Sequence, residues 1–96
     1  MDDIQIIWDL EDDPEGNYWH IVVEGHGVTC EEVEEVLLDD DNETDTSHSS
    51  GRPSVYGWTS LGQHIIVVYD EVMSDPRILY PVTAYPVPPR KKRRTP

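Results

Sequence analysis

Residues 53–85 read PSVYGWTSLGQHIIVVYDEVMSDPRILYPVTAY, and this stretch decides the fold. Its β-branched and aromatic residues gather in three short runs, which is typical of strands separated by turns. Consecutive strands that are joined by short turns pair antiparallel. The three strands of the predicted meander are residues 54–59, 63–70 and 77–85.

Two turn sequences join these predicted strands. Residues 60–62 (SLG) can close the first hairpin with Gly62 at a positive φ, and residues 73–76 (MSDP) can close the second. Pro81 lies inside the last strand and has no backbone N–H. We therefore expect that strand to be irregular at Pro81 or to lie at an edge there.

The segment before residue 25 predicts a strand and then a helix. Residues 4–8 (IQIIW) form a β-branched run typical of an opening strand. Residues 17–24 contain β-branched residues that favour a strand, yet Pro14 before them and Gly25 after them are typical of helix boundaries. We predict a helix for this stretch.

A second helix is predicted just after Thr29. Thr29 and Glu32 have the spacing of a capping box, and the apolar residues that follow share one helical face. Residues 39–50 are polar or acidic throughout and predict a solvated loop. The predicted fold is therefore α+β, with an N-terminal strand, two helices, and then a three-stranded antiparallel meander.

Charge is distributed unevenly along the 96 residues. Residues 1–89 contain two arginines and twenty carboxylates, which gives this part a formal net charge of −18. The run RKKRR at residues 90–94 adds +5, so the whole chain has a net charge of −13. A body this acidic repels phosphates within about 10 Å at ordinary salt, which disfavours general nucleic-acid binding. The basic run can bind nucleic acid, act as a localisation signal, or fold back on the acidic body.

The remaining composition indicates a cytoplasmic protein with polar-edged aromatic rings. Cys30 is the only cysteine, so no internal disulfide can form, and no apolar run of about 18 residues is present. Three Trp and five Tyr occur without any Phe, and such rings favour a sheet face or a groove. We expect Trp8 and Trp58 to be structural or part of a partner surface.

Several short motifs resemble the BrnT-type toxins, a family of ribonuclease toxins. In that family a W-D pair ends the first strand, an N-x-x-H-I run lies on the first helix, and H-G-V-[ST]-x-E-E opens the second. The corresponding segments here are residues 8–9 (WD), 17–21 (NYWHI) and 26–32 (HGVTCEE), with looser agreement at residues 51–52 (GR), Gly62, residues 65–69 (IIVVY) and Arg77.

The resemblance covers about residues 4–85 and implies a RelE-like fold. It also implies the toxin half of a type II toxin–antitoxin pair, neutralised by a small DNA-binding antitoxin, and a metal-independent endoribonuclease activity on RNA. The domain is expected over residues 1–88, with a basic, disordered tail at 89–96. No cofactor or metal is expected.

The resemblance and the residue chemistry indicate five candidate catalytic residues. His20 and His26 can act as general base and acid, although packing and backbone bonding are the alternative for both. Arg52 and Arg77 can clamp a phosphate, or can each pair with one of the many carboxylates. Tyr85 stands where the family's last strand carries arginine, and can contact a phosphate or pack on the sheet.

Two hypotheses follow from these residues. The first is a metal-independent endoribonuclease with its site in a groove between the meander and the first helix. The second is a catalytically inactive member of the same fold that binds a protein partner, and the acidic surface favours it.

Overall fold

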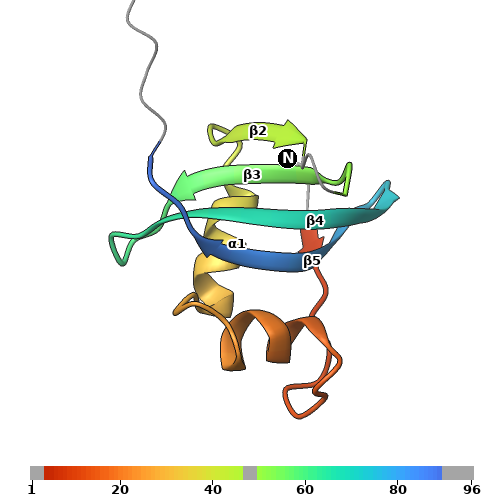
Figure 1. Ribbon diagram of the computed structural model, residues 1–96. Coiled ribbons are helices and arrows are strands. Elements are labelled where there is room, and N and C mark those ends of the chain that lie inside the picture. Colours follow the sequence, from red (N-terminus) through yellow and green to blue (C-terminus); the bar gives the residue numbers. More distant parts are fainter. Residues whose placement is uncertain (1–3, 47–49, 90–96) are drawn as a thin grey trace, which may run out of the picture.

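The structure of this chain, a computed structural model, describes residues 4–46 and 50–89 and is built on a five-stranded mixed sheet. The strand order is β1-β5-β4-β3-β2, and two short helical segments accompany the sheet (Figure 1). The elements in chain order are β1 (Ile4–Ile6), η1 (Trp19–Val23), α1 (Cys30–Leu38), β2 (Glu43–Thr46), β3 (Pro53–Trp58), β4 (His64–Ser74) and β5 (Arg77–Pro86).

The predicted fold class, two helices followed by a three-stranded meander, is wrong. Strands β3, β4 and β5 do pair antiparallel in chain order, but the sheet continues on both sides of them. β2 lies antiparallel to β3 inside the segment that was predicted as a loop. β1 lies parallel to β5, with Ile4 opposite Arg77, which makes the sheet mixed. The strand at β1 was predicted, but its pairing with β5 was not, and the sequence of β2 carries no strand signal of its own.

The helix predicted over residues 17–24 is present at residues 17–23, but most of it is of a different type. η1 is a single π-helical turn in which the Glu24 N–H donates to the Trp19 carbonyl at 2.8 Å. Tyr18 precedes it and provides no side-chain cap. The β-branched residues that follow Trp19 limit regular helix formation, because their side chains crowd the preceding turn. η1 lies beside β5, below it in Figure 1.

The second helix begins as the sequence predicted. The Thr29 hydroxyl accepts from the Glu32 N–H at 3.1 Å, and the Glu32 carboxylate accepts from the Thr29 N–H at 3.1 Å, which completes the capping box. α1 places Val33 and Val36, both fully buried, on one face of the sheet. This face of the sheet and α1 enclose the core.

Turns and irregularities in the meander follow the predicted residues. Gly62 has a φ of 87° in the turn between β3 and β4. The register between β4 and β5 shifts between Val68 and Tyr69, which face Thr83 and Pro81. The predicted irregularity at Pro81 is confirmed. Gly57 has a packing role instead, because a Cβ at this position would collide with the Asn42 side chain.

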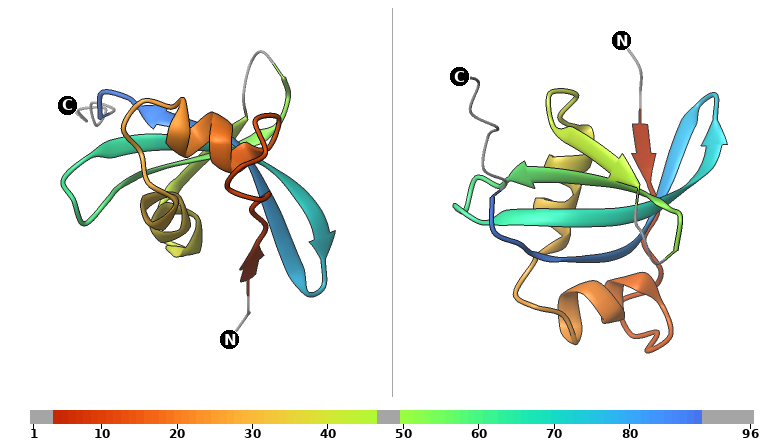
Figure 2. Two further views of the ribbon diagram at one scale, coloured as in Figure 1. Left: turned by 90° about the horizontal axis from the view of Figure 1, so that it is seen from below. Right: turned by 45° about the horizontal axis from the view of Figure 1, so that its top comes forward.

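Only one face of the sheet carries a helix among the described residues. α1 lies behind the sheet in Figure 1, and Figure 2 shows the sheet from two other sides. Side chains alternate between the two faces of a strand, so the neighbours of the core residues Val55, Ile65 and Val67 point away from α1. We call this side the open face, because no described helix covers it, and define it by Ser54, Tyr56, Trp58, His64, Ile66, Val68, Thr83 and Tyr85, of which Ser54, Ile66 and Val68 are buried.

Neither helical segment in the described ranges is long and apolar enough to cross a lipid bilayer. The basic run at residues 90–94, for which three roles were predicted, lies outside the described residues.

Candidate functional site

The open face carries a cluster of aromatic rings at one end. The His64 ring lies nearly parallel to that of Tyr56, with centroids 6.4 Å apart, and 5.1 Å from that of Trp58. Trp58 is 59% exposed, although a tryptophan side chain gains much from burial. A large ring held against its neighbours and left open to solvent provides contact area for a binding partner.

His64 joins this cluster to the segment that follows β5. Its Nδ1 lies 3.1 Å from the Val87 carbonyl, and the Val87 N–H donates to the His64 carbonyl at 2.9 Å. The His64 ring is therefore held in place from both the side chain and the backbone. After Val87 only residues 88 and 89 are described, so Val87 holds the end of the described chain on the sheet.

Tyr85 and His26 meet at the other border of the open face. The two ring centroids lie 6.2 Å apart, edge to face, and both residues are exposed. His26 comes from the loop before α1, while Tyr85 lies opposite Ile66 on the sheet. The structure thus brings together two of the five predicted site residues.

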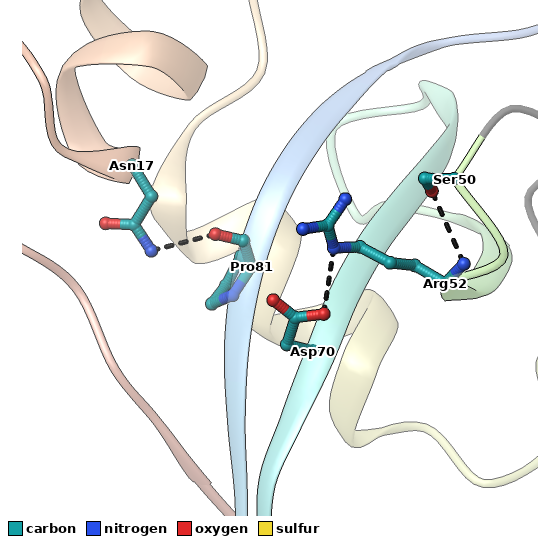
Figure 3. Close-up of polar contacts among 5 residues, drawn as sticks. All are labelled: Asn17, Ser50, Arg52, Asp70 and Pro81. Atoms are coloured by element: carbon teal, nitrogen blue, oxygen red, sulfur yellow. Dashed lines mark hydrogen bonds and ion pairs between the residues drawn. The ribbon is translucent and has the colours of Figure 1, made fainter.

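Arg52 extends across the open face but is paired with a carboxylate. Its Nε donates to Asp70 Oδ1 at 2.8 Å, and its backbone N–H donates to the Ser50 hydroxyl at 3.3 Å (Figure 3). The side chain reaches across β4 to make the first contact. The alternative predicted for Arg52, a salt bridge with a nearby carboxylate, is confirmed.

Arg77 is also paired, at a different place. Its Nε lies 3.3 Å from Glu71 Oε2 and its Nη2 lies 3.4 Å from the Tyr69 hydroxyl. It lines a small cavity of about 100 Å³ at the end of α1, together with the carboxylates of Asp39 and Asp40. A phosphate would meet more negative than positive charge in this cavity.

His20 lies in η1 and lines a shallow depression of about 350 Å³. It is exposed, and the other titratable residues that line the depression are Glu15, Glu24 and Tyr80. None of the lining residues is a lysine or an arginine. The developing charge on a phosphorane needs cations nearby, so this depression does not meet the requirement for RNA cleavage.

The five predicted site residues therefore do not form one site. His20 lies in one depression, Arg77 lines another that shares no residue with it, and Arg52 pairs with Asp70 across the sheet. Only His26 and Tyr85 contact one another. The structure therefore does not bring His20 and both arginines together in the predicted groove between the meander and the first helix.

The first two motifs of the resemblance, WD at residues 8–9 and NYWHI at residues 17–21, have a structural role. Asn17, 3% exposed, accepts from the Asp9 N–H and donates to the carbonyls of Ile7 and Pro81 at 3.0 and 2.9 Å. Figure 3 shows the second of these two donated bonds. Asn17 thus fixes the turn after β1 onto β5.

Asp9 completes this arrangement. It accepts from the Tyr80 hydroxyl at 2.5 Å and from the Asn17 N–H at 2.9 Å. These bonds lower the pKa of Asp9, the Tyr80 bond most, and the same bond raises the pKa of Tyr80 to about 12. Asp9 is held as an anion and Tyr80 as a neutral donor, so neither can exchange a proton near neutral pH.

The third motif, HGVTCEE at residues 26–32, also has a structural role, through Glu32. This carboxylate is 2% exposed and accepts from the Thr59 hydroxyl at 2.6 Å and from Gln63 Nε2 at 3.0 and 3.1 Å. Burial alone raises its pKa, but the hydrogen bonds from Thr59, Thr29 and Gln63 outweigh that effect and lower it. An ionised Glu32 therefore ties α1 to the turn between β3 and β4.

Neither the lone thiol nor a metal offers an alternative chemistry within the described residues. Burial and the adjacent Glu31 raise the pKa of the Cys30 thiol, which keeps it protonated at neutral pH. No group of three or more His, Cys, Asp or Glu residues in residues 4–46 and 50–89 is placed to hold a metal ion.

Sequence reasoning placed aromatic rings at a sheet face and named Trp58 as structural or part of a partner surface, but it did not predict that Tyr56 and His64 gather beside Trp58. The alternation of Tyr56 and Trp58 along one strand was the available signal, because residues two apart share a face. Asp70 and Glu71 were missed as partners of the arginines. Their sequence separations from Arg52 and Arg77 give no local pattern.

Comparison with protein-family models found no family that matches this chain, and comparisons with curated proteins and with solved structures gave no match either. The resemblance to BrnT-type toxins stays a prediction.

Proposed function

We propose that this chain is a catalytically inactive protein-binding module whose open face binds a basic partner. The observation that carries the proposal is the aromatic cluster of Tyr56, Trp58 and His64 on a sheet face that no described helix covers. Aromatic residues are enriched in protein interfaces and provide much of their binding energy.

The charge of the body supports a basic partner. Residues 1–89 have a formal net charge of −18, so they attract a cationic surface and repel an anionic one. Exposed tryptophan and tyrosine rings also attract arginine and lysine side chains through cation–π contacts. A small DNA-binding protein of the antitoxin kind carries such a surface, because DNA binding requires lysines and arginines.

A metal-independent endoribonuclease is the second candidate. It is favoured by the HGVTCEE segment and by the exposed His20 beside a neutral Tyr80 in one depression. Two observations weigh against it: both arginines of the body are paired with carboxylates, and the His20 depression is lined by Glu15 and Glu24.

A binding titration tests the first proposal. The purified full chain is titrated with the small DNA-binding protein encoded by an adjacent reading frame, and the Trp58→Ser variant is compared with Leu10→Ala. Leu10 is 76% exposed and lies on the turn after β1, so it serves as a matched surface control. We expect Trp58→Ser to weaken binding at least 30-fold, as for an interface residue worth about 2 kcal/mol. Equal affinities for both variants, or no binding to a folded wild-type chain, would contradict the proposal.

Cleavage of a long single-stranded RNA in EDTA separates the two candidates. We expect no cleavage by the wild-type chain. Cleavage that is lost in both His20→Ala and Arg52→Ala would establish the ribonuclease instead.

A further inference from the structure

The basic run at residues 90–94 begins close to the aromatic cluster of the open face. Val87 is fixed to His64 by two hydrogen bonds, and His64 lies opposite Trp58 in the pairing of β3 and β4. Residue 90 follows only three positions later. The described chain therefore leaves the sheet at its Trp58 end.

Acidic side chains lie on the same face, two strands away from His64. Glu43 is opposite Tyr56 and Asp45 is opposite Ser54 in the pairing of β2 and β3. Residues directly opposite in an antiparallel pair point to the same side of the sheet. Glu43 and Asp45 therefore border the open face on β2. We call Tyr56, Trp58, Glu43 and Asp45 the acidic–aromatic patch.

The tail is long enough to reach the whole patch. Neighbouring strands lie about 4.8 Å apart, so the distance from β5 to β2 is about 15 Å. Residues 88–94 span up to about 23 Å when extended, at about 3.3 Å per residue. A chain that starts beside His64 can thus place its arginines and lysines over Trp58 and Tyr56 and next to Glu43 and Asp45.

The chemistry of the tail matches the patch. Five consecutive cations meet two exposed or partly exposed rings and two carboxylates on a body whose balance is −18. Arginine and lysine bind aromatic faces within about 6 Å of the ring centroid, and they attract carboxylates over about a Debye length, roughly 8 Å at physiological salt. No covalent change is needed to form this contact.

We propose that the basic run 90–94 binds intramolecularly to the acidic–aromatic patch, so that the free chain masks its own partner-binding face. The consequence of this contact rests on the proposed function: a basic partner that binds the open face must first displace the tail. A short tether gives an effective concentration on the order of 1 mM. If the tail as a separate peptide binds with a Kd of about 0.1 mM, the apparent affinity for a partner falls about tenfold.

Nuclear magnetic resonance of the tryptophan indole N–H groups tests this contact in the full chain. The chain has three indoles, and two of them serve as internal controls: Trp8, which donates to Glu34 on α1, and Trp19, which lies in η1. The first variant replaces each of the five basic residues of the run with glutamine. We expect the Trp58 indole signal to shift in this variant while the signals of Trp8 and Trp19 stay in place. Raising NaCl from about 0.05 to 0.5 M should shift the wild-type Trp58 signal in the same direction.

A peptide with the sequence of residues 88–96 provides the second measurement. It should bind the glutamine-tail variant at least tenfold more tightly than the wild-type chain, because the wild-type tail competes for the patch. Glu43→Gln combined with Asp45→Asn should weaken this binding at least fivefold. The control, Glu11→Gln combined with Asp12→Asn, removes the same charge from the exposed turn after β1 and should leave the affinity within twofold.

Three results would overturn the inference. The first is a Trp58 signal that neither tail neutralisation nor salt moves. The second is equal peptide affinity for the wild-type and glutamine-tail chains. The third is a shift that depends on protein concentration, which would place the tail on a second copy of the chain. A partner that binds through Trp58 in spite of any of these results would leave the proposed function intact.

Discussion

Glu32 is the buried charge on which the link between α1 and the sheet depends, and its replacement by glutamine should destabilise the domain strongly. Glutamine has the same shape, but it exchanges one accepting oxygen for an NH₂ group that donates. That group would face the Gln63 amide and, depending on which oxygen it replaces, either the Thr59 hydroxyl or the Thr29 N–H, all of which now donate to Glu32. At least one buried donor then loses its acceptor.

The expected loss of unfolding free energy is about 2–4 kcal/mol. A hydrogen bond to a charged group contributes about 1.5–3 kcal/mol, and a buried group left unsatisfied costs about 1–3 kcal/mol. For a domain of this size each kcal/mol lowers Tm by about 4–8 °C, so a drop of roughly 10–25 °C should accompany the substitution. Urea unfolding followed by tryptophan fluorescence at pH 7 measures the change directly.

Glu31→Gln is the matched control, because it removes the same charge from the same helical turn at an exposed position. It should remain within about 0.5 kcal/mol of the wild type. The pKa of Glu32 is lowered from its ordinary value of 4.5, so its contribution is fully present above that pH and is lost as pH falls through the lowered value. Equal stabilities of Glu32→Gln and Glu31→Gln at pH 7 would refute this reasoning.

The other predictions concern the turn after β1 and the close packing on β3. Asn17→Ala should cost about 3 kcal/mol in urea unfolding, because its buried amide bonds three backbone groups; a loss under 1 kcal/mol would contradict this role. Tyr80→Phe should cost about 1 kcal/mol at pH 7. Since the pKa of Tyr80 is raised to about 12 and that of Asp9 is lowered below 3.8, this difference should stay constant between about pH 5 and 9 and shrink outside that range when unfolding is repeated across pH. Gly57→Ala should cost about 1–3 kcal/mol by displacing Asn42, and the cost should be clearly smaller when measured in an Asn42→Ala background.

The parts of the fold that sequence reasoning predicted are those with a local signal. Thr29 and Glu32 are three residues apart and form the capping box that predicts the start of α1, and Gly62 has the positive φ that the turn between β3 and β4 requires. β2 has no comparable signal, because its residues ETDT contain no apolar side chain. Its hydrogen bonds to β3 make it a strand, and that pairing depends on the tertiary structure.

The same distinction applies to the candidate site. The chemistry of Arg52 and Arg77 was visible in the sequence, but their carboxylate partners were not, because any of twenty acidic residues could have been chosen. The role of Glu32 shows most clearly what the sequence alone could not predict. Its capping position was predicted, whereas its bond to Thr59, 27 residues away, required the fold.

The pairing of β1 with β5 also has a consequence for how this protein is made. Ile4 is synthesised 73 residues before its partner Arg77. Until then β1 has no strand to bind, and the turn that Asn17 anchors to Pro81 cannot close. Contacts between distant segments slow folding, because the loop between them must be ordered first. The nascent chain therefore completes its sheet only after β5 has been synthesised, and a product truncated before β5 lacks the strand that pairs with both β1 and β4.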